Sequence, residues 1–109
     1  MKTGSVAGFA TAEDEKEAES IAKALLGKKL AACCNIIPNV KSDFWWKGKL
    51  EKAEEVLLII KTRKGLADEV IEEIKSVHSY EVPAIEFLDI SKGNPDFLKW
   101  IEDETGEGK

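Results

Sequence analysis

The side chains best suited to metal or thiol chemistry are the single histidine, His78, and two adjacent cysteines, Cys33 and Cys34. Imidazole nitrogen and thiolate sulfur are ligands that copper accepts readily, so His78 with a cysteine is one interpretation, a site for copper or another divalent cation. The alternative is structural, because the dipole of a helix favours an imidazolium at its C-terminal end, where His78 is predicted. No Cys-x-x-Cys pair or other paired metal-ligand spacing occurs in the sequence.

The two cysteines are expected to be free thiols. Neighbours in an extended strand point to opposite faces, so Cys33 and Cys34 cannot easily form a disulfide with each other. Free thiols are typical of a reducing compartment, which favours the cytoplasm. One of the two must face inward, where a cysteine behaves as a small apolar residue.

The sequence carries no recognisable catalytic constellation. It lacks a serine with a nearby histidine motif, a glycine-rich phosphate loop and the spacing of a metalloprotease. We therefore predict that the protein is not an enzyme. The alternative of an enzyme without a motif stays open, because acids and bases are recognised by their geometry in the fold.

Composition places the chain among globular proteins of a single domain, residues 1–109. Its 109 residues are 43% hydrophobic and 34% charged, which suits one hydrophobic core. The formal net charge of -5 argues against nucleic acid as a partner, since phosphate binding needs clustered basic residues. The longest uncharged apolar run, residues 56–60, is far short of the roughly 20 needed to cross a bilayer, and the N-terminus has no signal-peptide pattern. We expect no membrane partner and a cytoplasmic location.

Hydrophobic patterning predicts the elements that must position these residues. A buried strand is expected over 4–11, followed by a helix that Thr11 and Asp14 cap and Gly27 ends. Its inner face would carry Ala18, Ile21, Ala22 and Leu25. The segments 30–46 and 49–62 read as a β-hairpin with its turn at Lys47–Gly48 and a bend at Pro38–Asn39. The apolar run 56–60 predicts a central strand covered on both faces.

The remaining segments complete the pattern. We expect a helix over 66–77 that packs through Leu66, Val70, Ile74 and Val77, then a strand over 82–90. Asn94 and Pro95 predict the start of a C-terminal helix that packs through Phe97, Leu98 and Ile101, and the tail 105–109 is expected to fray. The order β-α-β-β-α-β with an extra C-terminal helix indicates an α+β, ferredoxin-like fold.

The hairpin is too long for its domain. Strands of 14 to 17 residues reach on the order of 50 Å, whereas a domain of about 100 residues has a radius of gyration of about 13 Å. Its tip carries Phe44, Trp45 and Trp46, so a projecting ribbon would be unstable unless a neighbouring copy covered it. The alternative is that the strand breaks at Pro38–Asn39 and folds back, with the tryptophans packed on the chain's own core.

Four segments, residues 30–38, 44–49, 54–62 and 78–83, together resemble the CutA divalent-cation-tolerance family over nearly the whole chain. The resemblance implies homotrimers whose long hairpins link subunits through shared sheets, no tightly bound cofactor, and tolerance to copper and other divalent cations. A trimeric architecture similar to that of PII signalling proteins further suggests that a small ligand binds in clefts between subunits.

The resemblance also assigns residues. His78 matches the family's histidine, and Cys33 matches its cysteine, which makes Cys33 the candidate thiol. The resemblance places five further residues near the cleft between subunits: Glu55, Lys61, Tyr80, Glu81 and Trp46. A charge at a strand end is normally solvated, but Lys61 directly follows five apolar residues, which favours the cleft.

The chain also departs from the family pattern. It has Ala10 and Val77 where some members have a further Cys and His, and Ser79 and Ala84 where Pro and Glu are usual.

The function that these observations predict is that of a homotrimeric copper or divalent-cation tolerance protein, which binds a metal ion or a small molecule between subunits. The alternative is a structural or signalling trimer with PII-like architecture that acts through protein partners.

Overall fold

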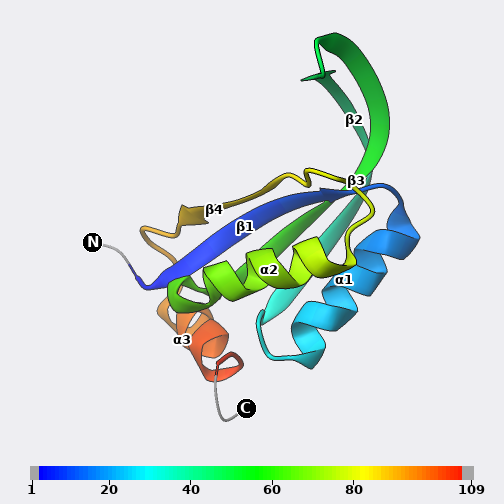
Figure 1. Cartoon of the computed structure of the whole chain (residues 1–109). Coiled ribbons are helices and arrows are strands. Elements are labelled where there is room, and N and C mark those ends of the chain that lie inside the picture. The colour runs from blue at the N-terminus through cyan, green and yellow to red at the C-terminus, as the bar shows by residue number, and fades with distance from the viewer. Residues whose placement is uncertain (1–2, 107–109) are drawn as a thin grey trace.

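Four strands and three α-helices follow one another in the computed structural model, which describes residues 3–106 (Figure 1). Their bounds are β1 Ser5–Ala12, α1 Glu15–Gly27, β2 Cys33–Trp46, β3 Lys49–Arg63, α2 Ala67–Val77, β4 Ile85–Asp89 and α3 Pro95–Asp103, with a short 3-10 helix at Lys64–Leu66 before α2. The strands form one antiparallel sheet in the order β2-β3-β1-β4. This arrangement confirms the α+β, ferredoxin-like prediction.

One face of the sheet packs against α1 and α2, and the core lies between them. Ile21 and Leu25 of α1 and Ile74 of α2 are fully buried against Leu58 and Ile60 of β3. The predicted inner face of α1 is thereby confirmed. Leu57 and Ile59, which alternate with the buried positions of β3, are only partly buried. The prediction that both faces of β3 are covered is therefore wrong for a single chain, because α1 and α2 shield one face only.

Helix α1 begins one turn later than predicted. Strand β1 continues through Thr11 to Ala12, because Ala12 is fully buried opposite Val56 of β3. The N-cap is Asp14, whose side chain accepts from the backbone N–H of Glu17, and the Glu17 carboxylate in turn accepts from that of Glu13. This pair satisfies the N–H of Glu17 in the first turn and the N–H of Glu13 just before the N-cap, much as a capping box does.

Strand β4 and the two later helices differ from prediction in extent or packing. The strand covers five residues at the edge of the sheet and excludes Val82, which is 66% exposed. The intervening Pro83 has no N–H to donate to a ladder, so pairing starts after it. Val77 of α2 and Phe97 of α3 are exposed rather than packed inward, whereas Ile101 is fully buried and Asn94 caps α3 as predicted.

The predicted fraying of the tail is wrong for Thr105, which is fully buried. The Arg63 guanidinium donates to its hydroxyl and to its carbonyl oxygen, and the hydroxyl donates to the Ile101 carbonyl. The Gly106 N–H donates to the Lys29 carbonyl, which ties the end of α3 to the loop after α1. Residues 107–109 lie outside the described part of the chain.

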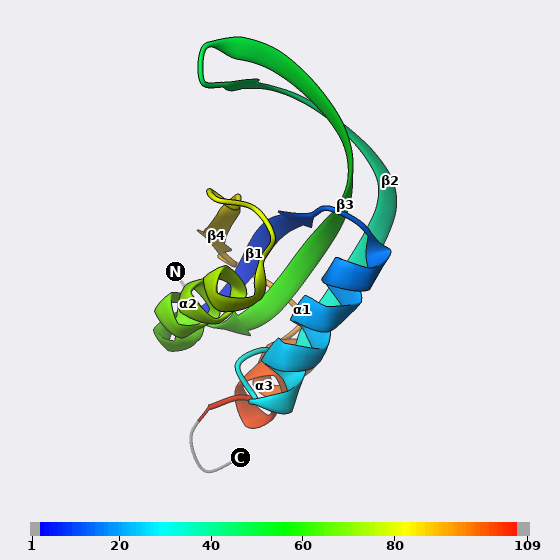
Figure 2. The ribbon, with the colours of Figure 1, turned by 45° about the vertical axis from the view of Figure 1, so that its right-hand side comes forward.

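The hairpin of β2 and β3 projects from the domain, as predicted, and curves as it does so (Figure 2). Strand β2 passes Pro38 and Asn39 with a register shift between Ile37 and Val40 and continues to Trp46. Trp45 is 72% exposed, so the fold-back alternative is excluded. The largest dimension of the molecule is 43 Å, shorter than the extended estimate for the hairpin, because the ribbon bends.

Candidate functional site

His78 lies where α2 ends, and both of its ring nitrogens are engaged within the protein. Nε2 donates to the Thr11 carbonyl oxygen at 2.7 Å, and Nδ1 accepts from the Tyr80 N–H at 3.0 Å. A carbonyl can only accept and an N–H can only donate, so these two bonds select the neutral Nε2–H tautomer. The side chain is 0% exposed. In this arrangement the ring has no lone pair available for a metal and anchors residues 78–80 to β1.

Glu17 holds the same segment from α1. One carboxylate oxygen accepts from the Glu13 N–H, and the other accepts from the Ser79 N–H at 2.7 Å and lies 3.8 Å from Nδ1 of His78. Burial opposes the charge on Glu17, but hydrogen bonds from Glu13 and Ser79 outweigh it and hold the pKa of Glu17 below its ordinary value. This contact was missed from the sequence, although Glu17 stands three residues after Asp14, the spacing of a capping box.

Tyr80 reaches from this segment to β3. Its hydroxyl donates to Oε2 of Glu55 at 2.8 Å, and its ring lies 4.7 Å from the ring of His78. Glu55 is 7% exposed, and its carboxylate accepts this hydrogen bond from the phenol. Burial, the hydrogen bond and the charge of Glu55 raise the pKa of Tyr80 above its ordinary value. The structure thus brings together two of the predicted cleft residues, Glu55 and Tyr80.

Lys61 and Cys33 lie on another part of the sheet. They are opposite each other on β3 and β2, and the Lys61 ammonium donates to Oδ1 of Asn35 at 2.6 Å. Cys33 is partly exposed, and its thiol lies 3.7 Å from the same oxygen. Cys34 is the inward cysteine and packs against the core, where burial above all raises the pKa of its thiol to about 12. The two thiols are free, in line with prediction.

The remaining predicted residues do not join either group within one copy. Glu81 is exposed, and Trp46 stands at the tip of the hairpin, 37% exposed, with the Lys47 ammonium 5.5 Å from its ring centroid. Among residues 3–106 no three His, Cys, Asp or Glu side chains are placed to hold a metal ion together. A ligand set within one described copy is therefore incomplete.

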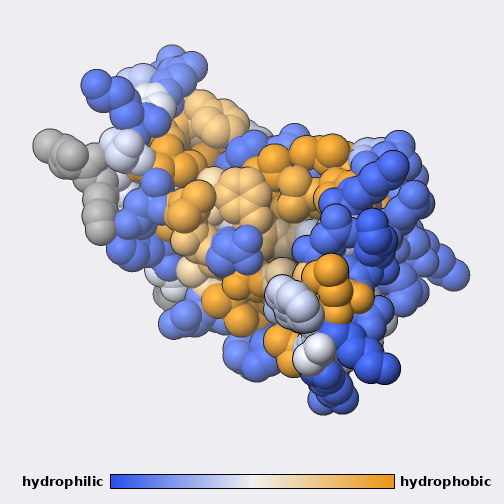
Figure 3. All heavy atoms as spheres, turned by 90° about the horizontal axis from the view of Figure 1, so that it is seen from above, coloured by the Kyte–Doolittle hydropathy of each residue, from blue (hydrophilic) through white to orange (hydrophobic). Residues whose placement is uncertain are grey.

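The sheet face opposite α1 and α2 carries an apolar surface. Alternation along the strands places Leu57 and Ile59 of β3, Phe9 of β1, Ile37 of β2 and Leu88 of β4 on this face. We call it the open face. In Figure 3, which looks down on the side away from the helices, apolar atoms gather over the middle and hydrophilic atoms line the margins. Large exposed apolar patches are typical of surfaces that bind other molecules.

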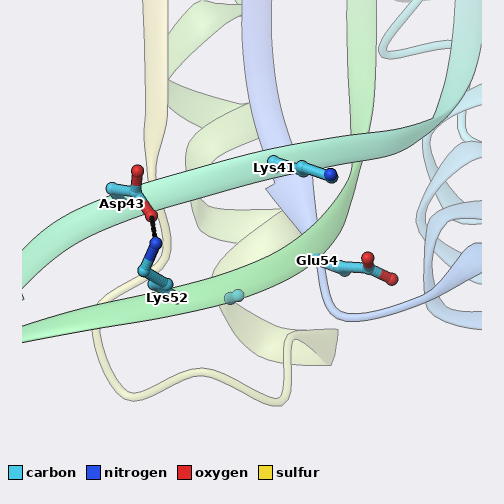
Figure 4. Close-up of a pocket in the computed structure, with 5 residues that line it drawn as sticks. Lys41, Asp43, Lys52 and Glu54 are labelled. Atoms are coloured by element: carbon cyan, nitrogen blue, oxygen red, sulfur yellow. Dashed lines mark ion pairs between the residues drawn. The ribbon is translucent and has the colours of Figure 1, made fainter.

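The projecting part of the hairpin, residues 40–55, is called the arm, and its two faces differ. Val40, Phe44 and Trp46 stand opposite Glu55, Glu51 and Lys49, on the face that continues the open face. The other face carries the cross-strand pairs Lys41–Glu54 and Asp43–Lys52, which line a shallow hollow (Figure 4). Nζ of Lys52 lies 3.9 Å from Oδ1 of Asp43. Charges of both signs cancel there, so the hollow does not select a charged ligand.

No helix within residues 3–106 is both long enough and apolar enough to cross a membrane.

Comparison with known proteins identifies relatives over almost the whole chain. A curated divalent-cation tolerance protein CutA of Archaeoglobus fulgidus is 52% identical over 99 residues, which are 91% of this chain and 95% of that protein. A mouse protein CutA is 46% identical over 103 residues; the match spans 94% of this chain but only 58% of the mouse protein.

Solved structures agree with the fold. The crystal structure of CutA1 from Oryza sativa superposes with a TM-score of 0.93 at 37% identity and covers 98% of both chains. A structure described as the periplasmic divalent cation tolerance protein CutA from Archaeoglobus fulgidus gives a TM-score of 0.89 at 48% identity, over 92% of this chain and 97% of that one. The model of the CutA1 divalent ion tolerance proteins matches residues 6–104. The chain therefore belongs to the CutA1 divalent ion tolerance family.

Proposed function

We propose that the protein acts as a homotrimer that provides tolerance to divalent cations, copper foremost, by binding a metal ion or a small molecule in clefts between its subunits. The observation that carries this proposal is the open face, which is apolar, lies opposite the helices and continues onto the arm. Burying such a surface stabilises an assembly by roughly 25 cal/mol per Å² of apolar area. The compartment that we propose is the cytoplasm.

The incomplete site supports a cleft shared between copies. Glu55 and Tyr80 lie near the base of the arm, whereas Trp46 lies at its tip and Lys61 lies lower on the sheet. A neighbouring arm laid over the open face would bring a second Trp46 toward residues that a single copy keeps apart. We propose that this cleft binds its ligand without catalysing a reaction and needs no tightly bound cofactor.

Copper binding would be weak and sensitive to pH. His78 can offer a lone pair only after giving up the hydrogen bond from Tyr80, which costs about 1 kcal/mol. Cys33 is the accessible thiol, and its thiolate is the form that binds metal. We propose His78 as the metal ligand, helped by Cys33 of another copy, because the two residues lie on different parts of the sheet within one copy.

Calorimetric titration of copper into the purified trimer tests the metal site. We expect weak binding that falls between pH 7.5 and pH 5.5 and is lost in His78→Ala, with Glu19→Ala on exposed α1 surface as the control. Submicromolar binding that survives His78→Ala would show that the cysteines or the N-terminal amine hold the metal. Titration of copper into Cys33→Ser then tests whether the accessible thiol is the ligand.

A second candidate is a structural or signalling trimer that acts through protein partners. The engagement of both nitrogens of His78 favours it over a metal-binding role. A verified trimer that takes up no copper at either pH would select this candidate.

A further inference from the structure

The hairpin is held in register at two places. At its tip, Trp46 pairs with Lys49 across a two-residue turn in which Lys47 and Gly48 have φ of 51° and 81°, the signs of a type I′ turn. At its base, Cys33 pairs with Lys61, and β3 is fixed there by its ladder to β1. Between these anchors β2 has one residue more than β3. The excess must be absorbed within the ribbon.

It is absorbed at Pro38 and Asn39. These two residues stand opposite Val56 alone, between the pairs Ile37–Leu57 and Val40–Glu55. Asn39 has a φ of 65°, in the left-handed region that asparagine tolerates better than most residues. Pro38 has no N–H to contribute to the ladder. The irregularity is therefore a β-bulge, which bends the ribbon and increases its twist.

The bulge lies where the arm leaves the domain. Val56 pairs with Ala12, the last residue of β1, so beyond this level β3 has only β2 as a neighbour. Figure 2 shows the arm curving over the side of the sheet away from α1 and α2. Val40, Phe44 and Trp46 share the face of Ile37 and Leu57, so the bend turns an apolar strip toward the space above the open face.

The size of this surface fits a second copy. Four strands about 4.8 Å apart and some six residues long present about 400 Å² in plan, and the arm adds about 200 Å². This plan area of about 600 Å² approaches the roughly 800 Å² that each partner buries in a stable interface. Charges of both signs, Lys49 and Glu51 on the arm and Lys61 and Glu86 on the sheet, border it, so that a second copy can place opposite charges against them.

We infer that the one-residue bulge at Pro38–Asn39 sets the direction of the arm and thereby decides whether the arm can close on a second copy of this chain. This inference rests on the proposed assembly. It assigns to the bulge a geometric role, separate from the apolar contacts themselves.

Deletion of Asn39 tests the bulge. Without the extra residue Val40 remains opposite Glu55, so every side chain of the arm keeps its face while the bend is lost. We expect a folded chain, by near-ultraviolet circular dichroism, whose assembly by light scattering needs at least tenfold higher concentration than wild type. Asn39→Gly is the matched control, because glycine accepts a positive φ, and its assembly should equal that of wild type.

A full-length variant keeps the inference falsifiable if the deletion does not fold. Asn39→Val places a β-branched residue where φ is positive, which opposes the bulge without shortening the chain. We expect it to assemble at least tenfold more weakly than Asn39→Gly. Wild-type assembly of either the folded deletion or Asn39→Val would overturn the role of the bulge and leave the proposed trimer intact. A monomeric wild type at micromolar concentration would overturn the proposed assembly itself.

Discussion

At the scale of single residues, the segment after α2 is fixed by three side chains from three parts of the fold. His78 fixes it to β1, Glu17 fixes it to α1, and Tyr80 fixes it to Glu55 of β3. Each contact satisfies a buried or partly buried polar group, and removing one partner leaves the other without compensation. The shape of this edge of the open face therefore depends on a few hydrogen bonds.

Tyr80→Phe should lower the free energy of unfolding at pH 7 by about 1–2 kcal/mol, because it leaves the buried Glu55 carboxylate without the phenol. The raised pKa of Tyr80 sets the pH dependence. Tyr80 has a higher pKa in the folded protein than in the unfolded chain, where the pKa is about 10. Its protonated phenol therefore stabilises the fold fully below about pH 10, and this stabilisation is lost as the pH rises further. The difference in the free energy of unfolding between wild type and Tyr80→Phe should thus shrink above about pH 10. Denaturant melts from pH 7 to 11 measure it, and a constant difference would contradict the assignment.

Glu17→Ala has the opposite pH dependence. The pKa of Glu17 is lowered on folding, so its stabilisation is present above the unfolded value of about 4.3 and disappears as pH falls through the folded value. We expect a loss of about 1–2 kcal/mol at pH 7 that narrows below about pH 4. Glu19→Ala, at an exposed position of the same helix, is the control and should change stability by less than about 0.5 kcal/mol. Equal losses for both variants at pH 7 would show that the loss of a negative charge from α1, not the contact to Ser79, is responsible.

At the scale of elements, the end of α3 is closed by a backbone conformation that favours glycine. Gly106 has a φ of 101°, and an added Cβ would collide with the Arg63 guanidinium, which is held by two hydrogen bonds to Thr105. We expect Gly106→Ala to lower the free energy of unfolding by about 2 kcal/mol or more, which corresponds to a fall in Tm of roughly 8 °C or more. Gly27→Ala, with open space around it and an ordinary φ, should be neutral or stabilise by up to about 1 kcal/mol. Thermal melts of Gly106→Ala and Gly27→Ala measure both effects, and an equal Tm for the two variants would contradict the expected strain at Gly106.

Periodicity predicted the existence and order of the elements well. The inner face of α1 and the Asn94 cap of α3 were confirmed because a local pattern of apolar spacing or capping specifies them. The misplaced start of α1, the short β4 and the buried Thr105 have a different cause. Ala12 and Thr105 take their environments from Val56 and Arg63, which are far away in sequence, whereas β4 is short because the neighbouring Pro83 has no N–H for the ladder.

The candidate site was predicted only in part for the same reason. That Tyr80 would meet Glu55, and that both nitrogens of His78 would be occupied, depends on the path of β1 and α1 past residue 78. The sequence could not indicate either contact. The choice of Cys34 as the inward cysteine follows from strand register, which two adjacent identical residues leave open.

At the scale of the whole molecule, the arm gives the protein more apolar surface than one copy can bury. Phe44 and Trp46 lie on the face that continues the open face, while Trp45 lies on the opposite face with Leu50. All four are exposed in a single copy, at 39%, 37%, 72% and 63% in that order. If copies close on the open face, Trp46 is the tryptophan that matters for assembly, because it lies on the face of the arm that continues the open face.

Trp46→Ala should therefore lower Tm in a manner that depends on protein concentration, because oligomerisation links stability to the concentration of protomers. We expect the stability of the assembly to fall by about 2 kcal/mol per protomer, the size of a strong interface contact. Light scattering should show weaker assembly. Trp45→Ala is the matched control. It removes the same residue type one position away, where the side chain lies on the other face of the arm opposite Leu50, and it should leave assembly unchanged. Wild type and Trp46→Ala are melted over a hundredfold range of concentration. If the two midpoints differ by the same amount at every concentration, Trp46 acts within one copy and the open face is not the surface through which the chains assemble.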